Sequence, residues 1–185
     1  MNLTGAWDVF LLFVIPLGGG VPSGIVLAKN RGLHWLVMLF LYLISDVVLA
    51  IVFEPLLVLF LRMSENSPRL LKMREALAKS TKMTIGRLGV SPGPFSLVAI
   101  AFGTDPMTGR SVAKVAGHGF LSGWTFAIVG DMLFFTVLMV STLWLDNVLG
   151  NGTWAAIIIT VAMMALPPFI RLIRERWRRW RLPPA

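Results

Sequence analysis

The chain has 185 residues, of which 56% are hydrophobic and 14% are charged, and its net charge is +8. Soluble domains carry about 25% charged residues, so this composition argues against a soluble domain and favours a membrane protein with several apolar runs. The basic residues cluster between and after those runs, which indicates membrane orientation and contact with anionic lipid rather than nucleic-acid binding. The absence of cysteine excludes disulfides and thiolate metal sites. The first residues resemble no signal peptide, so none is expected to be removed.

The first apolar run, residues 9–28, is interrupted by six helix-disfavouring residues within nine positions. These are Pro16, Gly18, Gly19, Gly20, Pro22 and Gly24. Because they argue against one continuous helix, we expect a re-entrant hairpin, which enters and leaves the membrane on one side. Its tip is predicted at Pro16, Gly19 and Pro22.

A short polar turn at 29–32 leads into a long apolar run at 34–61, which can span a membrane with tilt and is expected to kink near Pro55. The polar stretch that follows places Leu70, Met73 and Leu77 on one helical face. This pattern predicts an amphipathic connector helix on the membrane surface, with an ordinary solvated linker helix as the alternative.

The stretch from Gly89 to Gly103 is apolar but has 15 residues, about 22 Å as a helix against a hydrocarbon core of about 30 Å. Pro92, Gly93 and Pro94 break its start. We therefore expect a second re-entrant hairpin, with its tip at Ser91, Pro92, Gly93 and Pro94. Residues 104–110 are predicted to form a turn.

Two further apolar runs follow, at 117–145 and 153–170, separated by a predicted turn at 146–152. The glycines of the first, including Gly119, Gly123 and Gly130, suit close helix packing and a homodimer interface. The tail interleaves six arginines with Trp177 and Trp180, a mixture typical of the headgroup region.

The positive-inside rule decides between two topologies. If all five apolar runs spanned the membrane and the tail were cytoplasmic, seven basic residues of the connector would face outward. If the first run and the Pro92 stretch are both re-entrant, fifteen of the seventeen basic residues lie inside and only Lys29 and Arg31 lie outside. The second arrangement is the one we expect.

The predicted fold is therefore an all-α integral membrane protein with an inverted repeat, each unit a re-entrant hairpin followed by a long transmembrane helix, plus an extra C-terminal transmembrane helix. One membrane domain, 1–185, comprises repeat one (9–62), the cytoplasmic connector (63–88), repeat two (89–145), the last span (153–170) and a basic cytoplasmic tail (171–185). Inverted repeats with broken segments are typical of secondary transporters.

This arrangement resembles the DedA/VTT-type membrane proteins and the small multidrug-export family. The resemblance covers roughly residues 9–145, and Gly86-Arg87-Leu88, Pro92-Gly93 and Ala116-Gly117 are similar to the second DedA hairpin. The chain has Pro94 where DedA proteins carry an arginine, and its first hairpin lacks the acidic residue of that family. The resemblance implies a transporter of small solutes or lipid carriers.

Four charged residues are the candidates for coupling or substrate binding: Asp46, Asp131, Glu54 and Arg87. Asp46 and Asp131 lie well inside apolar runs, where a carboxylate costs about 2.5–3.5 kcal/mol to insert, although each could instead accept hydrogen bonds from hairpin amides. Glu54, beside Pro55, could equally mark a kink or an interface. Arg31 and Arg110 are expected to be interfacial anchors, although both, like Arg87, could instead steer an anion or pair with the carboxylates.

No metal site, cofactor or enzymatic activity is predicted. His34 and His118 are isolated and are expected to have structural roles, and no nucleophile-elbow motif supports a hydrolase using Ser91, His118 and Asp131. The favoured function is secondary transport of a small or amphiphilic solute in a bacterial-type inner membrane, with the C-terminus cytoplasmic. The expected partners are anionic lipid headgroups at the tail, a small solute and a second copy of the chain, but no nucleic acid. The alternative is a lipid-handling or membrane-assembly protein without solute transport.

Overall fold

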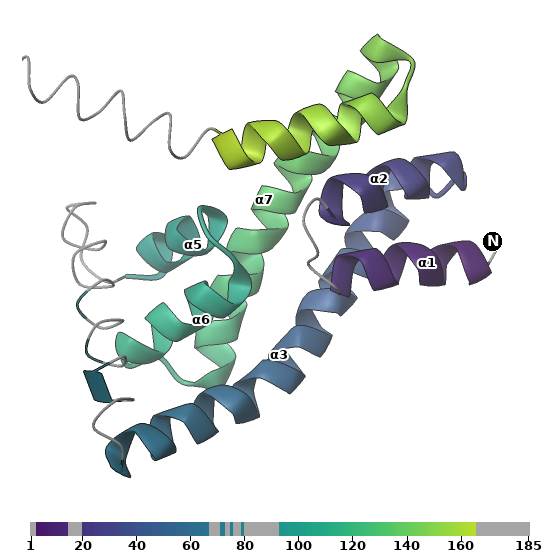
Figure 1. Cartoon of the computed structure of the whole chain (residues 1–185). Helices are drawn as coiled ribbons and strands as arrows, with labels where there is room; N and C mark the ends of the chain where they lie inside the picture. Colours follow the sequence, from purple (N-terminus) through teal and green to yellow (C-terminus); the bar gives the residue numbers. More distant parts are fainter. Residues whose placement is uncertain are drawn as a thin grey trace, which may run out of the picture. The chain divides into compact units, whose positions relative to one another are not determined.

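The computed structural model describes residues 3–14, 20–66 and 93–165, together with Leu71, Lys72, Glu75 and Lys79 of the connector. Regular structure in these residues is entirely helical, as the sequence predicts (Figure 1). The chain divides into two compact units: Met1–Leu33 with Leu138–Ala185, and His34–Val137. We call them unit 1 and unit 2.

Unit 1 begins with two short helices, α1 (Leu3–Val14) and α2 (Gly20–Asn30), which pack side by side (Figure 1). Gly24 of α2 lies against Phe13 of α1, and a Cβ at this glycine would come within 2.6 Å of the Phe13 ring. Pro22, predicted at the hairpin tip, instead lies in the first turn of α2, where a proline removes no intrahelical hydrogen bond.

The end of α7 (Phe120–Leu149) belongs to unit 1 and is followed by the helix Gly152–Ala165. The predicted turn at 146–152 is therefore too long, because α7 continues past Asp146 and the chain turns at Gly150, which has φ +64°. Lys29 Nζ, at the end of α2, lies 2.6 Å from Asp146 Oδ2 and 2.6 Å from Asn147 Oδ1. This ion pair joins the end of α2 to the end of α7.

Unit 2 contains α3 (Trp35–Asn66) and the first part of α7, which run antiparallel. Tyr42, early in α3, stacks on Phe135 with ring centroids 3.9 Å apart, whereas Phe53, later in α3, meets Trp124, earlier in α7. The α3 helix continues through Pro55 and ends five residues beyond the predicted run.

Between α3 and α7 in the chain come α5 (Pro94–Phe102) and α6 (Pro106–Val115), which pack on each other (Figure 1). The prediction of a turn over 104–110 is wrong for most of its length, because α6 begins at Pro106. The Asp105 side chain caps this helix by accepting a hydrogen bond of 2.8 Å from the Thr108 amide. Aspartate at the N-cap followed by proline is a helix-start signal, and it can be read from the sequence alone.

Two of the α7 glycines that were expected at a dimer interface, Gly123 and Gly130, pack against helices of the same chain. A Cβ at Gly130 would lie 2.5 Å from the Val98 carbonyl oxygen of α5, and one at Gly123 would lie 2.5 Å from Arg110 Nη1 of α6. These glycines therefore allow α5 and α6 to approach α7 closely. Gly123 and Gly130 are thus used in packing within the chain, and the expected homodimer stays a prediction.

Local features of the first half recur 85 positions later in the second. The equivalent pairs are Gly24 and Gly109, Lys29 and Lys114, Gly32 and Gly117, Trp35 and Phe120, and Asp46 and Asp131. Gly32 and Gly117 both have positive φ, 70° and 88°, and both end a helix with the same two hydrogen bonds, a Schellman motif. Trp35 and Phe120 are the first residues of α3 and α7. The second short helix, the turn and the long helix are thus repeated.

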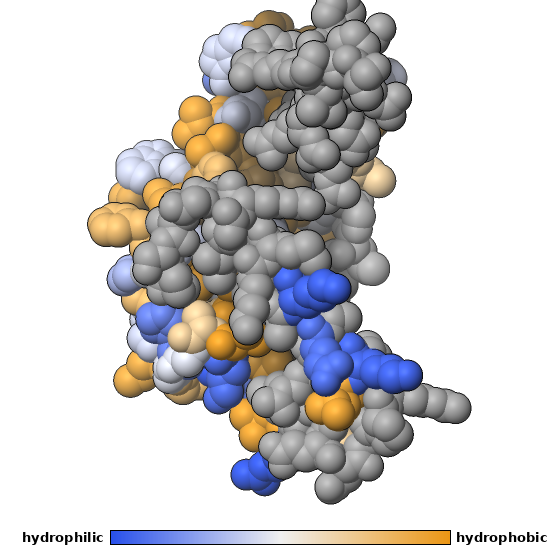
Figure 2. Space-filling view, turned by 90° about the vertical axis from the view of Figure 1, so that its left-hand side faces the viewer, coloured by the Kyte–Doolittle hydropathy of each residue, from blue (hydrophilic) through white to orange (hydrophobic). Residues whose placement is uncertain are grey.

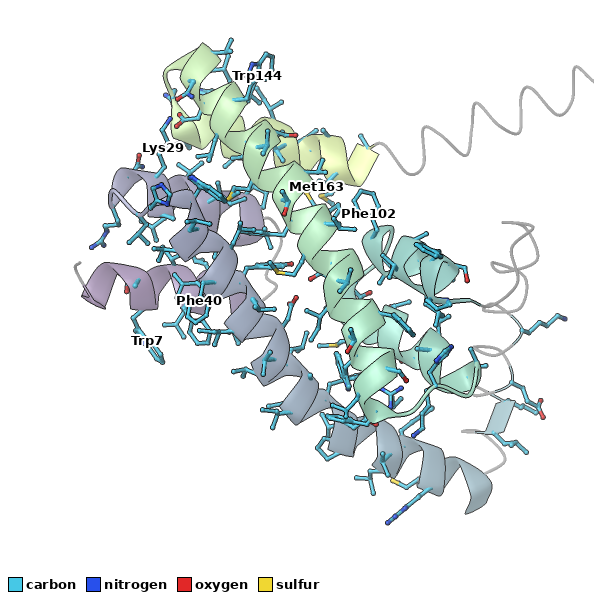
Figure 3. The ribbon with its side chains drawn as sticks, turned by 180° about the vertical axis from the view of Figure 1, so that it is seen from behind. Trp7, Lys29, Phe40, Phe102, Trp144 and Met163 are labelled. Atoms are coloured by element: carbon cyan, nitrogen blue, oxygen red, sulfur yellow. The ribbon has the colours of Figure 1, made fainter. Side chains whose placement is uncertain are left out.

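Two helices, α3 over Trp35–Phe60 and α7 over Phe120–Leu149, are long and apolar enough to cross a membrane. Only 28% of the most apolar stretch of α3, and 39% of that of α7, is buried inside the protein. Phe40 and Trp144 are among the exposed aromatic side chains (Figure 3), and hydrophobic residues are exposed on the face shown in Figure 2. Such large exposed apolar areas are typical of contact with lipid or a partner, not of a soluble core helix.

Several predicted segments lie outside the described residues. They are the tip residues Pro16, Gly19, Ser91 and Pro92, the candidate Arg87, most of the amphipathic connector, the end of the last span beyond Ala165 and the basic tail. Of the second hairpin tip, Gly93 is the N-cap of α5 and Pro94 is its first residue.

Candidate functional site

Two buried carboxylates, Asp46 and Asp131, meet inside unit 2, and we call them the carboxylate pair. Asp46 lies one third of the way along α3 and Asp131 at the equivalent position of α7, and each has an exposed fraction of 3%. Their side chains are close enough to interact directly. The antiparallel packing of the two helices brings these equivalent positions together.

Tyr42 supplies the neighbouring hydrogen-bond donor. Its hydroxyl donates to Asp131 Oδ2 over 2.8 Å, and its ring stacks on Phe135. Tyr42 lies one helical turn before Asp46, so both project from the same face of α3. Ser45, also buried, donates to the Tyr42 carbonyl oxygen over 2.7 Å and so satisfies its own hydroxyl within the helix.

One oxygen of this cluster has no hydrogen-bond partner. Within the described part of the chain, Asp46 Oδ2 and Thr142 Oγ1 are the buried side-chain polar atoms without one. A buried polar atom left unsatisfied costs about 1–3 kcal/mol, and more when it is charged. Two adjacent carboxylates also repel each other when both are ionised. The geometry therefore favours binding of a proton or a small cation at the carboxylate pair.

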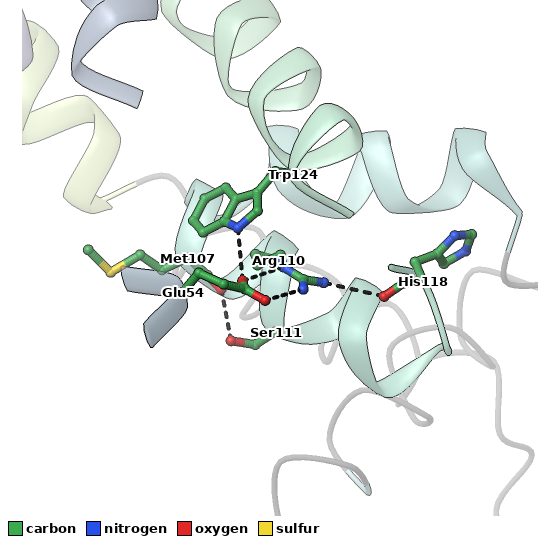
Figure 4. Close-up of polar contacts among 6 residues, drawn as sticks. All are labelled: Glu54, Met107, Arg110, Ser111, His118 and Trp124. Carbon is green, nitrogen blue, oxygen red and sulfur yellow. Dashed lines mark hydrogen bonds and ion pairs between the residues drawn. The ribbon is translucent and has the colours of Figure 1, made fainter. Parts of the chain in front are cut away.

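A second polar group in unit 2, the arginine cluster, consists of Glu54, Arg110 and Trp124 (Figure 4). Arg110 Nε and Nη2 donate to the two oxygens of Glu54 over 2.8 and 2.6 Å, and Trp124 Nε1 donates to Glu54 Oε2 over 2.9 Å. The cluster joins α3, α6 and the start of α7.

The location of Arg110 corrects the prediction that it is an interfacial anchor. Its side chain has no exposed surface, and that of Glu54 is 14% exposed. Gly123, by lacking a side chain, leaves room for the guanidinium. A buried arginine needs a carboxylate and good geometry to offset its desolvation, and the two parallel hydrogen bonds from Arg110 to Glu54 provide both. Glu54 is thus a partner of Arg110 and is separate from the carboxylate pair.

The two histidines occupy helix starts. His34 Nδ1 accepts a hydrogen bond of 3.3 Å from the Leu36 amide at the beginning of α3. The His118 carbonyl oxygen accepts a hydrogen bond of 3.5 Å from Arg110 Nη1. The imidazole ring of His118 packs edge-on against Phe126. Both histidines therefore have local structural contacts. The described residues contain no group of three or more histidine, cysteine, aspartate or glutamate side chains arranged to hold a metal ion.

The sequence predicts Asp46, Asp131 and Glu54 as candidates and Arg110 as an interfacial anchor, but it gives Tyr42 and Trp124 no role. Tyr42 carried a signal, because it is the only tyrosine in the chain and lies four residues before Asp46. No local pattern indicated that Arg110 and Trp124 pair with Glu54, because these contacts join positions 56 and 70 residues apart.

No protein-family model, no curated protein and no solved structure matches this chain. The resemblance to DedA/VTT-type and small multidrug-export proteins remains a prediction based on the motifs quoted above.

Proposed function

We propose that this chain is a multi-pass protein of a bacterial-type plasma membrane that carries out secondary transport of a small or amphiphilic solute. The observation that carries the proposal is the carboxylate pair, in which Asp46 and Asp131 meet from equivalent positions of two apolar helices. Carboxylates within spanning helices are costly and usually mark an ion or substrate path.

The antiparallel packing of α3 and α7 supports an inverted repeat. If each crosses the membrane once, in opposite directions, the chain between them leaves and returns on the same side. The pair α5 and α6 would then be re-entrant. The turn at Gly117, which leads into α7, would lie on the same side of the membrane as the connector. The 85-residue recurrence of turn, helix start and aspartate supports the same architecture.

The ion pair in unit 1 agrees with this topology. Lys29 at the end of α2 contacts Asp146 at the end of α7, so these two ends share one side of the membrane. With the basic connector and tail inside, Lys29 and Asp146 lie outside. In this proposal the basic tail places the C-terminus in the cytoplasm, and α3 and α7 cross the membrane in opposite directions.

In the proposed cycle the carboxylate pair is the coupling site. Binding of one proton or cation between Asp46 and Asp131 relieves their repulsion, and release toward the other side restores it. Tyr42 positions Asp131 through its hydrogen bond. Two repeats of opposite orientation meeting at the midplane allow access to alternate between the two sides.

The test compares purified variants in proteoliposomes, with uptake of the fluorescent cation ethidium under an imposed pH gradient as the first probe. Asp46→Asn and Asp131→Asn should each lower uptake at least tenfold, whereas Asp8→Asn, which changes an exposed carboxylate, should leave it unchanged. If both aspartate variants retain full activity in this or a growth assay while truncation of the tail abolishes it, the alternative of a lipid-handling or assembly protein is favoured.

A further inference from the structure

An open apolar groove runs along α3 in unit 2. It has a volume of about 680 Å³ and is lined by Ile51, Glu54, Pro55, Val58, Leu59, Arg62 and Phe120. Its volume lies within the range of about 300–1,000 Å³ that is typical of sites for single small molecules. Ile51, Leu59 and Phe120 are exposed, with exposed fractions of 66%, 53% and 47%.

The length of the groove corresponds to one leaflet of a bilayer. From Ile51 to Arg62 the α3 axis rises about 16 Å, and half of the hydrocarbon core is about 15 Å. The apolar span of α3 ends at Phe60, so in a membrane-spanning α3 Arg62 would lie just beyond the hydrocarbon core, near the phosphate groups. The groove therefore has an acyl-chain-sized apolar part and a cation at its polar end.

The two charged residues at the groove, Glu54 and Arg62, differ in whether they can bind a ligand. Glu54 is held by Arg110 and Trp124, so its negative charge is already compensated. Arg62 is exposed, and the ion pairs found in the described residues do not include it. An arginine at this depth binds phosphate oxygens well, because its guanidinium presents several donors in a planar fork.

From this geometry we propose that the groove binds one anionic phospholipid, with an acyl chain along Ile51, Val58 and Leu59 and its phosphate at Arg62. The proposal requires α3 to lie in a membrane but does not depend on transport by the carboxylate pair. The lipid would come from the leaflet on the connector side, where anionic lipid attracts basic segments. Since Glu54 also lines the groove, the bound chain would cover the arginine cluster.

Native mass spectrometry of the intact chain tests this site, because it counts bound lipids and protein copies together. The probes are phosphatidylglycerol and phosphatidylcholine with identical acyl chains, each added to protein purified in mild detergent. Wild-type protein should retain one phosphatidylglycerol in preference to phosphatidylcholine. Arg62→Gln should lower phosphatidylglycerol retention about fivefold, the effect of one basic residue at an anionic membrane, while Arg31→Gln, in unit 1, should not.

A second pair of variants separates the acyl chain from the headgroup. Leu59→Trp fills the groove and should lower retention of both lipids, whereas Val140→Trp, an exposed position of α7 in unit 1, should not. If Arg62→Gln and Leu59→Trp retain lipid as the wild type does, no lipid site exists at the groove. If Leu59→Trp instead converts a dimer to a monomer, the groove is occupied by a second copy of the chain and the proposal is wrong.

Discussion

Replacing Glu54 with glutamine tests whether the arginine cluster stabilises unit 2. The substitution keeps the shape of the side chain and an oxygen that can accept from Trp124 Nε1, but it leaves the Arg110 charge buried without a counter-charge. Removing one partner of a buried ion pair costs about 3–5 kcal/mol. Because Glu54 is 14% exposed, we expect the lower end, about 3 kcal/mol. For a chain of this size, that lowers the melting temperature by about 6–12 °C.

The assay is thermal unfolding in mild detergent, followed by circular dichroism. The matched control is Asp8→Asn, because Asp8 and Arg31 form an ion pair whose side chains are 48% and 44% exposed and should contribute about 0–1 kcal/mol. Arg110→Met added to Glu54→Gln should recover at least half of the lost stability, since the lone charge is gone. A Glu54→Gln melting temperature no lower than that of Asp8→Asn would refute the reasoning.

Three further substitutions address packing, topology and the carboxylate pair. Gly130→Ala should destabilise the protein by about 1–3 kcal/mol in the same melting assay, because its Cβ meets the α5 backbone. Gly119→Ala should change the melting temperature little, because its Cβ would meet only the Ser122 hydroxyl, at 4.0 Å; equal effects would contradict the packing. Lys29→Asp should lower the melting temperature, because it places two carboxylates where Lys29 now contacts Asp146. Adding Asp146→Lys should restore the melting temperature, because it re-forms the ion pair with the charges exchanged. A double variant as unstable as Lys29→Asp would contradict the contact. Tyr42→Phe should cost about 1.5–3 kcal/mol through loss of the hydrogen bond to Asp131, and should slow ethidium uptake; unchanged stability would show that the bond contributes nothing.

The sequence predicts the two long helices and the break in the first apolar run, because these depend on local patterns. Apolar run length identifies α3 and α7, and the prolines and glycines between Pro16 and Gly24 identify a break, now observed as two packed helices. Errors arose where a cap was overlooked. Asp105 and Pro106 start a helix rather than a turn, and the Schellman turn at Gly117 was not recognised as a copy of that at Gly32.

The candidate site was predictable only in part. Asp46 and Asp131 stand out because a carboxylate in an apolar run is costly, yet that they meet depends on the antiparallel packing of two helices. The same holds for Glu54, whose partners lie on α6 and α7. Arg110 appeared to be an interfacial residue because a charge beside a glycine in a short polar segment is usually solvated. Its burial depends on the space left by Gly123, a long-range relation that no local pattern encodes.

The central claim is that α3 and α7 cross the membrane in opposite directions, so that Asp46 of α3 and Asp131 of α7 meet inside the membrane. Single cysteines at Arg31→Cys, Ser67→Cys, His118→Cys and Asn147→Cys test this directly, since the native chain has no cysteine. A membrane-impermeant maleimide applied to intact cells should label positions 31 and 147 but not 67 and 118, which should react only after the membrane is opened. Labelling of 31 and 67 from the same side, or of 67 and 118 from opposite sides, would contradict the inverted repeat and with it the proposed transport site.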